Sequence, residues 1–140
     1  AGGHIVPAAE ATAAIGAGFA ATLDALAGRR VVVLAAVPEP GYDVPTLEAT
    51  ARRFHRPPPA PPRRADHDAR QVVAKAWMAR AVAGRANVEI VDPAETLCDP
   101  AICRTMADGV PLYVDDNHPS PKGAAVIAEG LLPALARAKR

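Results

Sequence analysis

The run VVVLAAV at residues 31–37 decides the fold class of this 140-residue chain. It is short, continuously apolar and rich in β-branched residues, which is typical of a strand buried on both faces of a parallel sheet. Upstream of it, Ile15, Phe19 and Leu23 recur on one helical face. Their spacing predicts a helix over residues 8–27.

Downstream of this strand the pattern alternates again between helix and strand. It predicts a short helix over residues 47–54, a proline-rich internal loop at 57–64, a long helix from Asp66 or Asp68 to Gly84, and a strand over 88–91. Helices that alternate with short apolar strands imply right-handed crossovers and a parallel sheet. We therefore expect an α/β fold, with residues 1–140 forming a single domain.

The bulk composition excludes several functions. The formal net charge is +1 and the arginines are scattered without interleaved aromatic residues, so we expect no nucleic-acid partner. No apolar run approaches the roughly 20 residues that span a bilayer, so we expect the chain as given to be soluble. No motif for a cofactor occurs, and we expect none. The chain opens with Ala1 and not with methionine, which suggests a processed product or a piece of something longer.

The most informative segment lies near the C-terminus. Asp115 precedes His118 by three residues in a polar loop, and a carboxylate at that spacing can reach back to the imidazole and fix its tautomer. Asp116 is the competing carboxylate, and we expect it to point away into solvent or to cap local amides. Ser120 and Pro121 then form a matched helix start, with Ser120 as the N-cap.

The only two cysteines, Cys98 and Cys103, allow several interpretations. Their spacing permits a small local disulfide in an oxidising compartment, whereas a cytosolic chain would keep them as thiols. A thiolate nucleophile with His118 as its base is a less favoured alternative. A metal site that adds Asp115 and His118 is less favoured still, because the spacing matches no standard zinc pattern.

A family resemblance emerges from residues 113–124, Tyr-Val-Asp-Asp-Asn-His-Pro-Ser-Pro-Lys-Gly-Ala. This run resembles the last conserved block of the SGNH (GDSL-type) hydrolases. It is most similar to the SGNH domain at the C-terminal end of bacterial membrane acyltransferases of the acyltransferase-3 family, where Tyr-x-Asp-Asp-x-His-Leu-Ser-x-x-Gly-Ala is common. Residues 37–45, residues 91–93 and the two cysteines match as well, so the resemblance spans nearly the whole chain. Pro119 departs from the usual leucine.

The resemblance implies a three-layer α/β/α, flavodoxin-like fold in which His118 is the general base and Asp115 orients it. The base would activate a serine that forms a covalent acyl intermediate. The substrate would be an O-acyl group, with O-acetyl favoured, on a cell-envelope carbohydrate. Cys98 and Cys103 would form a disulfide in a periplasmic or extracellular domain, tethered to the membrane by an acyltransferase domain of the same polypeptide.

One departure from the family pattern affects activity. The family's Gly-Asp-Ser block is absent, and Ser120, the only serine, is expected to cap a helix. We therefore expect this chain to be the C-terminal portion of an SGNH domain, incomplete at its N-terminus, with the nucleophilic serine outside it. The alternative is a catalytically inactive SGNH-like remnant that binds glycan or a membrane acyltransferase partner.

The remaining histidines and aromatic residues have simpler explanations. His4, His55 and His67 are expected to be exposed imidazoles without function. Trp77 and Met78 occur at helical spacing and are expected in the core.

Overall fold

The computed structural model describes residues 7–138. The elements along the chain are α1 (Ala8–Ala25), β1 (Val31–Leu34), α2 (Val44–Arg53), α3 (Arg64–Val82), β2 (Val88–Val91), α4 (Ala94–Leu97), β3 (Met106–Ala107), β4 (Val110–Pro111) and α5 (Pro121–Ala138). Helices and strands are mixed and the longer strands are parallel, so the expected α/β class is confirmed.

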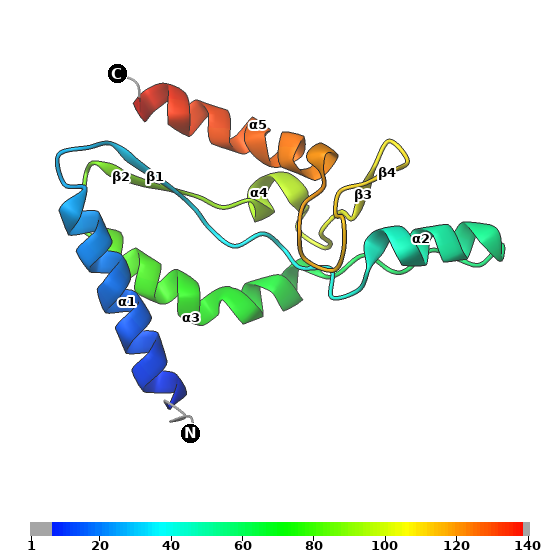
Figure 1. Ribbon diagram of the computed structural model, residues 1–140, viewed down its shortest axis with the longest axis horizontal. Helices are drawn as coiled ribbons and strands as arrows, with labels where there is room; N and C mark the ends of the chain where they lie inside the picture. The colour runs from blue at the N-terminus through cyan, green and yellow to red at the C-terminus, as the bar shows by residue number, and fades with distance from the viewer. Residues whose placement is uncertain (1–6, 139–140) are drawn as a thin grey trace, which may run out of the picture.

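Strands β1 and β2 form a two-stranded parallel sheet in which Val31 pairs with Val88 and Leu34 with Val91. In the view of Figure 1, helix α5 lies on one side of these strands and the α1–α3 pair lies on the other. Helices α1 and α3 are joined by an edge-to-face contact between Phe19 and Trp77, whose ring centroids lie 5.2 Å apart. The strands are thus flanked by helices on two sides.

Strand β1 is shorter than expected. It ends at Leu34 and not at residue 37. The amide of Ala35 still donates to the carbonyl of Val91 at 2.9 Å. Beyond that bond the partner strand ends, since Pro93 has no amide hydrogen and starts the turn into α4. The length of the pairing partner, not the apolar run itself, therefore sets the end of the strand.

Helix α3 begins at Arg64, two residues before the earlier of the two expected starts. The proline-rich segment ahead of it is irregular up to Pro62, and Arg63 forms an isolated bridge with Ile102. The Arg64 amide then donates to the carbonyl of Ala101 at 2.9 Å. A distant segment thus satisfies the first helical amide, which no local signal indicates.

Two small elements were not expected from the sequence. Helix α4 follows Asp92, whose carboxylate accepts a 2.9 Å hydrogen bond from the Ala94 amide. Strands β3 and β4 form a two-residue hairpin in which Asp108 and Gly109 both have positive φ, at 51° and 75°. An Asp-Gly pair in this conformation is the signal for a tight hairpin of the primed type.

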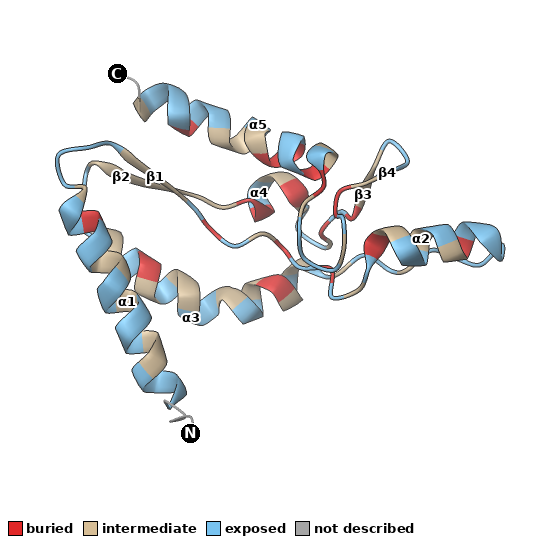
Figure 2. Cartoon of the chain, viewed as in Figure 1, coloured by how far each residue is buried: buried red, intermediate tan, exposed pale blue. Residues whose placement is uncertain are grey.

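The hydrophobic core lies beneath the first half of α5 and not along the sheet. Its buried members are Val44, Leu97, Leu112, Tyr113, Val126 and Ile127. The expected apolar faces of α1 and α3 are only partly covered, because Ile15 is 58% and Val73 57% exposed while Leu23 is buried. Figure 2 shows exposed residues along much of α1. Two short strands offer too little surface to cover them. Among residues 7–138 no helix has the length and apolarity needed to cross a membrane.

Candidate active site

The expected catalytic pair lies in the turn between β4 and α5. The carboxylate of Asp115 and the imidazole of His118 are in contact, with Oδ2 of Asp115 2.7 Å from Nδ1 of His118. The other carboxylate oxygen accepts hydrogen bonds from the backbone amides of Asn117, at 2.9 Å, and of His118, at 2.7 Å. The carboxylate therefore binds the ring and the turn that carries the ring.

These bonds decide which ring nitrogen is free to act as a base. The two backbone amides and the imidazole lower the pKa of Asp115 to about 2, so the carboxyl group is ionised at neutral pH and can only accept. In the neutral imidazole of His118, Nδ1 must then carry the hydrogen, which leaves the lone pair on Nε2. The His118 side chain is 72% exposed, so that lone pair is accessible to a reactant.

The loop is attached to the segment that follows β1. The buried hydroxyl of Tyr113 donates to the Pro38 carbonyl at 2.7 Å, and burial raises the pKa of this phenol. The amides of Gly41 and Val44 donate to the carbonyls of Asp116 and Asp115, both at 3.3 Å. The pair therefore lies at the carboxyl end of β1, where catalytic groups of open α/β sheets gather.

The start of α5 holds the loop from the other side. As expected, Ser120 caps the helix: its Oγ accepts from the Gly123 amide at 3.1 Å and donates to the Pro111 carbonyl at 2.7 Å. Gly123 lies against the backbone of Leu112, where a Cβ would come within 2.0 Å of the Leu112 carbonyl oxygen. Sequence reasoning missed this close approach, although a glycine in the first turn of a helix signals such a contact.

The competing carboxylate takes no part in the pair. Asp116 is exposed, and among the described residues its side chain makes no hydrogen bond or ion pair, while its backbone carbonyl accepts from Gly41. Asp115 is therefore the carboxylate that meets His118, as the spacing predicts.

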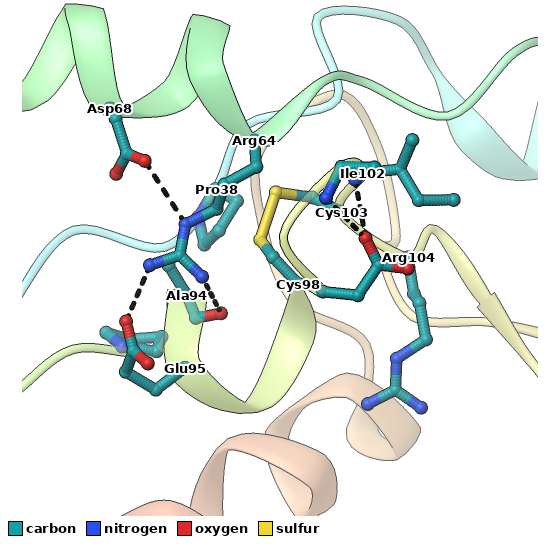
Figure 3. Close-up of a disulfide and its surroundings, with 12 residues drawn as sticks. Pro38, Arg64, Asp68, Ala94, Glu95, Cys98, Ile102, Cys103 and Arg104 are labelled. Carbon is teal, nitrogen blue, oxygen red and sulfur yellow. Dashed lines mark hydrogen bonds and ion pairs between the residues drawn. A yellow bond between two sulfur atoms is a disulfide. The ribbon is translucent and has the colours of Figure 1, made fainter.

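Cys98 and Cys103 lie at disulfide distance, with their sulfur atoms 2.07 Å apart (Figure 3). Between them, the Asp99 carboxylate accepts from the amides of Ala101 and Ile102, at 2.7 and 2.8 Å. The described residues contain no free thiol and no cluster of His, Cys, Asp or Glu side chains that could hold a metal. The geometry therefore does not favour the cysteine nucleophile or the metal site.

A network of ion pairs lies beside the disulfide, also visible in Figure 3. The Arg64 guanidinium bonds Asp68 at 3.3 Å, Glu95 at 2.5 Å and the carbonyl of Ala94 at 3.2 Å. Lys75 continues the network, because its ammonium reaches both Asp68 and Asp92. These contacts connect the start of α3 to α4 and to Asp92, which follows β2.

His67 corrects an expectation, because it is buried at 1% exposure and not a solvated imidazole. Neither ring nitrogen has a hydrogen-bond partner within the part of the chain that the structure describes. Burial therefore lowers the pKa of His67, although the charge of Asp92 opposes the effect. The sequence shows that His67 lies near the start of a helix, but not that its side chain faces the interior.

The two core residues expected on α3 differ in burial. Met78 is buried as expected, while Trp77 is only partly buried.

A shallow apolar depression of about 510 Å³ adjoins the loop. Its lining includes Pro45, Val110, Val114 and Lys122. Val114 directly precedes Asp115, and its amide donates to the His118 carbonyl at 2.9 Å. The depression thus shares a wall with the segment that carries the acid–histidine pair.

An α/β frame that presents an accessible, carboxylate-bound histidine after a strand is typical of enzymes of acyl transfer. The family model described as SGNH domain (fused to AT3 domains) matches residues 2–133. The chain belongs to this family, whose SGNH domains are associated with ester hydrolysis and acyl transfer. No curated protein and no solved structure matches the chain.

Proposed function

We propose that this chain is the base-bearing part of an SGNH-type O-acyl esterase or transferase that acts on O-acetyl groups of a cell-envelope carbohydrate. The observation that carries the proposal is the contact between Asp115 and Nδ1 of His118, which leaves Nε2 as a lone-pair base in the open. Nε2 takes the proton of a serine hydroxyl as the hydroxyl attacks the acyl carbon, and Asp115 stabilises the imidazolium that results.

The nucleophilic serine lies outside this sequence in the proposal. Ser120 is unsuited to the role, because its hydroxyl caps α5 and donates to the Pro111 carbonyl. The family description, which names fusion to AT3 domains, supports a membrane acyltransferase domain on the same polypeptide. The Cys98–Cys103 pair supports a periplasmic or extracellular location, since disulfides persist in oxidising compartments.

The experiment is an esterase assay on an upstream-extended form of the protein that contains a Gly-Asp-Ser block. Hydrolysis of a chromogenic acetyl ester and release of acetate from an acetylated envelope polysaccharide are measured in parallel. We expect His118→Ala and Asp115→Asn each to lower kcat at least about 100-fold, because positioned general bases contribute roughly 10²–10⁴-fold. Asp116→Asn is the matched control, and it should keep full activity since the Asp116 side chain is exposed.

One result would favour the alternative, and another would change the role of Asp115. If the extended form has no activity on either substrate but binds the polysaccharide, the domain is an inactive SGNH-like glycan-binding module. If Asp116→Asn and Asp115→Asn lower kcat equally, the orienting role of Asp115 is wrong. Activity on the chromogenic ester alone would support His118 as the general base, but it would mean that the proposed carbohydrate substrate is wrong.

A further inference from the structure

Helix α2 and the proline-rich segment after it form an arm that projects from the rest of the molecule (Figure 1). Several hydrogen bonds fasten the arm. The Val44 amide donates to the Asp115 carbonyl at 3.3 Å, and the Arg52 guanidinium donates to the Gly109 carbonyl of the β3–β4 hairpin at 3.2 Å. The Tyr42 hydroxyl donates to the Ala60 carbonyl at 3.4 Å, and the Cys103 amide donates to the Pro62 carbonyl at 2.8 Å. The tip, residues 52–58, is exposed at every position.

The tip has an ordered backbone reversal. The amide of Arg56 donates to the Ala51 carbonyl at 2.9 Å and that of His55 to the Arg52 carbonyl at 3.4 Å, with His55 at a φ of 51°. This is the helix-ending arrangement in which glycine is usual at the left-handed position. Because the backbone is bonded on both sides of the reversal, Phe54 is held at the far end of the arm.

The charge of the arm has one sign. Residues 49–65 contain five arginines and no aspartate or glutamate. Arg63 and Arg64 near the base are paired with carboxylates of α3 and α4. Arg53 and Arg56 at the tip form no ion pair with any carboxylate of residues 7–138. The tip therefore presents cations that no described residue neutralises.

These cations frame an apolar ring. The guanidinium carbons of Arg53 and Arg56 lie 5.8 and 5.9 Å from the centre of the Phe54 ring, which is 58% exposed. An aromatic ring flanked by two arginines matches the boundary between lipid headgroups and acyl chains. There the ring enters the apolar layer while the long arginine side chains reach lipid phosphates.

We propose that the arm tip, residues 52–58, docks onto the surface of an anionic lipid bilayer, with Phe54 inserted and Arg53 and Arg56 bound to lipid phosphates. This contact is independent of the acyl-transfer proposal, because the arm contains neither Asp115 nor His118. It would set the position of the domain relative to a membrane. A soluble acidic polysaccharide would also meet the charges, but the guanidinium groups of Arg53 and Arg56 already lie over the Phe54 ring on which a sugar would stack, so the lipid surface is the favoured partner.

The test uses the chain with vesicles of phosphatidylcholine alone or mixed equally with phosphatidylglycerol, in co-sedimentation at physiological salt. We expect binding only to the anionic vesicles. Arg53→Gln combined with Arg56→Gln should weaken it by about fivefold for each arginine, because a basic side chain near an anionic surface contributes about 1 kcal/mol. Arg29→Gln combined with Arg80→Gln removes the same charge from exposed positions elsewhere and should leave binding within twofold.

A second readout reports on the ring itself. In a Trp77→Phe background, Phe54→Trp should shift its emission to the blue with anionic vesicles and not with phosphatidylcholine alone. Equal weakening by the two double variants, absence of binding, or an unshifted tryptophan each overturns the proposal. Displacement of the bound chain from vesicles by a soluble acidic polysaccharide at equal charge concentration also overturns it and assigns the tip to glycan.

Discussion

Replacing Gly123 with alanine tests whether the start of α5 holds the candidate catalytic loop as tightly as the structure indicates. The new Cβ would lie 2.0 Å from the carbonyl oxygen and 3.0 Å from the carbonyl carbon of Leu112. Carbon–oxygen contacts are normally about 3.3 Å, so the backbone must move by roughly 1.3 Å. The obstacle is a main chain, and no side-chain rotation relieves the clash.

The cost follows from what Leu112 does. Its carbonyl accepts a hydrogen bond from the Ser120 amide and its amide donates to the Thr105 carbonyl, both at 2.9 Å. A shift of the Leu112 backbone therefore weakens both hydrogen bonds. Overpacking costs about 1–3 kcal/mol and a weakened hydrogen bond about 1 kcal/mol, while alanine gains at most about 1 kcal/mol of helix propensity. We expect Gly123→Ala to lower the free energy of unfolding by about 2 kcal/mol.

Urea denaturation followed by far-ultraviolet circular dichroism measures this loss. Gly18→Ala is the matched control, because Gly18 lies within α1 and a Cβ there meets nothing within 4 Å. It should raise the free energy of unfolding by about 0.5–1 kcal/mol through helix propensity alone. If Gly123→Ala is as stable as the parent chain, the close approach of α5 to Leu112 is wrong, and so is the account of how the loop is held.

Two further predictions concern the frame around the loop. Because burial lowers the pKa of His67 below its usual 6.5, the unfolded chain binds the proton more readily, and the free energy of unfolding should fall as pH decreases through about 6.5. Urea titrations at a series of pH values measure this decrease in the free energy of unfolding. His67→Leu should remove the part of the decrease that His67 causes, whereas His55→Gln, at an exposed position, should leave the decrease unchanged. Replacing Cys98 and Cys103 together with alanine should cost about 2 kcal/mol, the loop-closure value for a separation of five residues. Dithiothreitol should lower the stability of the parent chain and not of this double variant; an equal response in both would mean that the disulfide does not form in solution.

The acid–histidine pair was predictable because it is local. Asp115 and His118 are three residues apart, so one turn brings the carboxylate to the ring whatever the rest of the chain does. The Ser120 cap is local for the same reason. The hairpin at Asp108 was missed although its Asp-Gly pair is a recognised signal, because strands of two residues show no periodicity.

The sequence by itself determined the elements and chemistry that depend on near neighbours: the apolar strands that begin at Val31 and Val88, the long helices and the Asp115–His118 turn. The tertiary structure alone decided what depends on distant segments meeting. It buried His67 and set Gly123 against the Leu112 backbone. The physical reason is that hydrogen bonding and helical spacing act over a few residues, whereas burial and close approach depend on which surfaces the fold brings together.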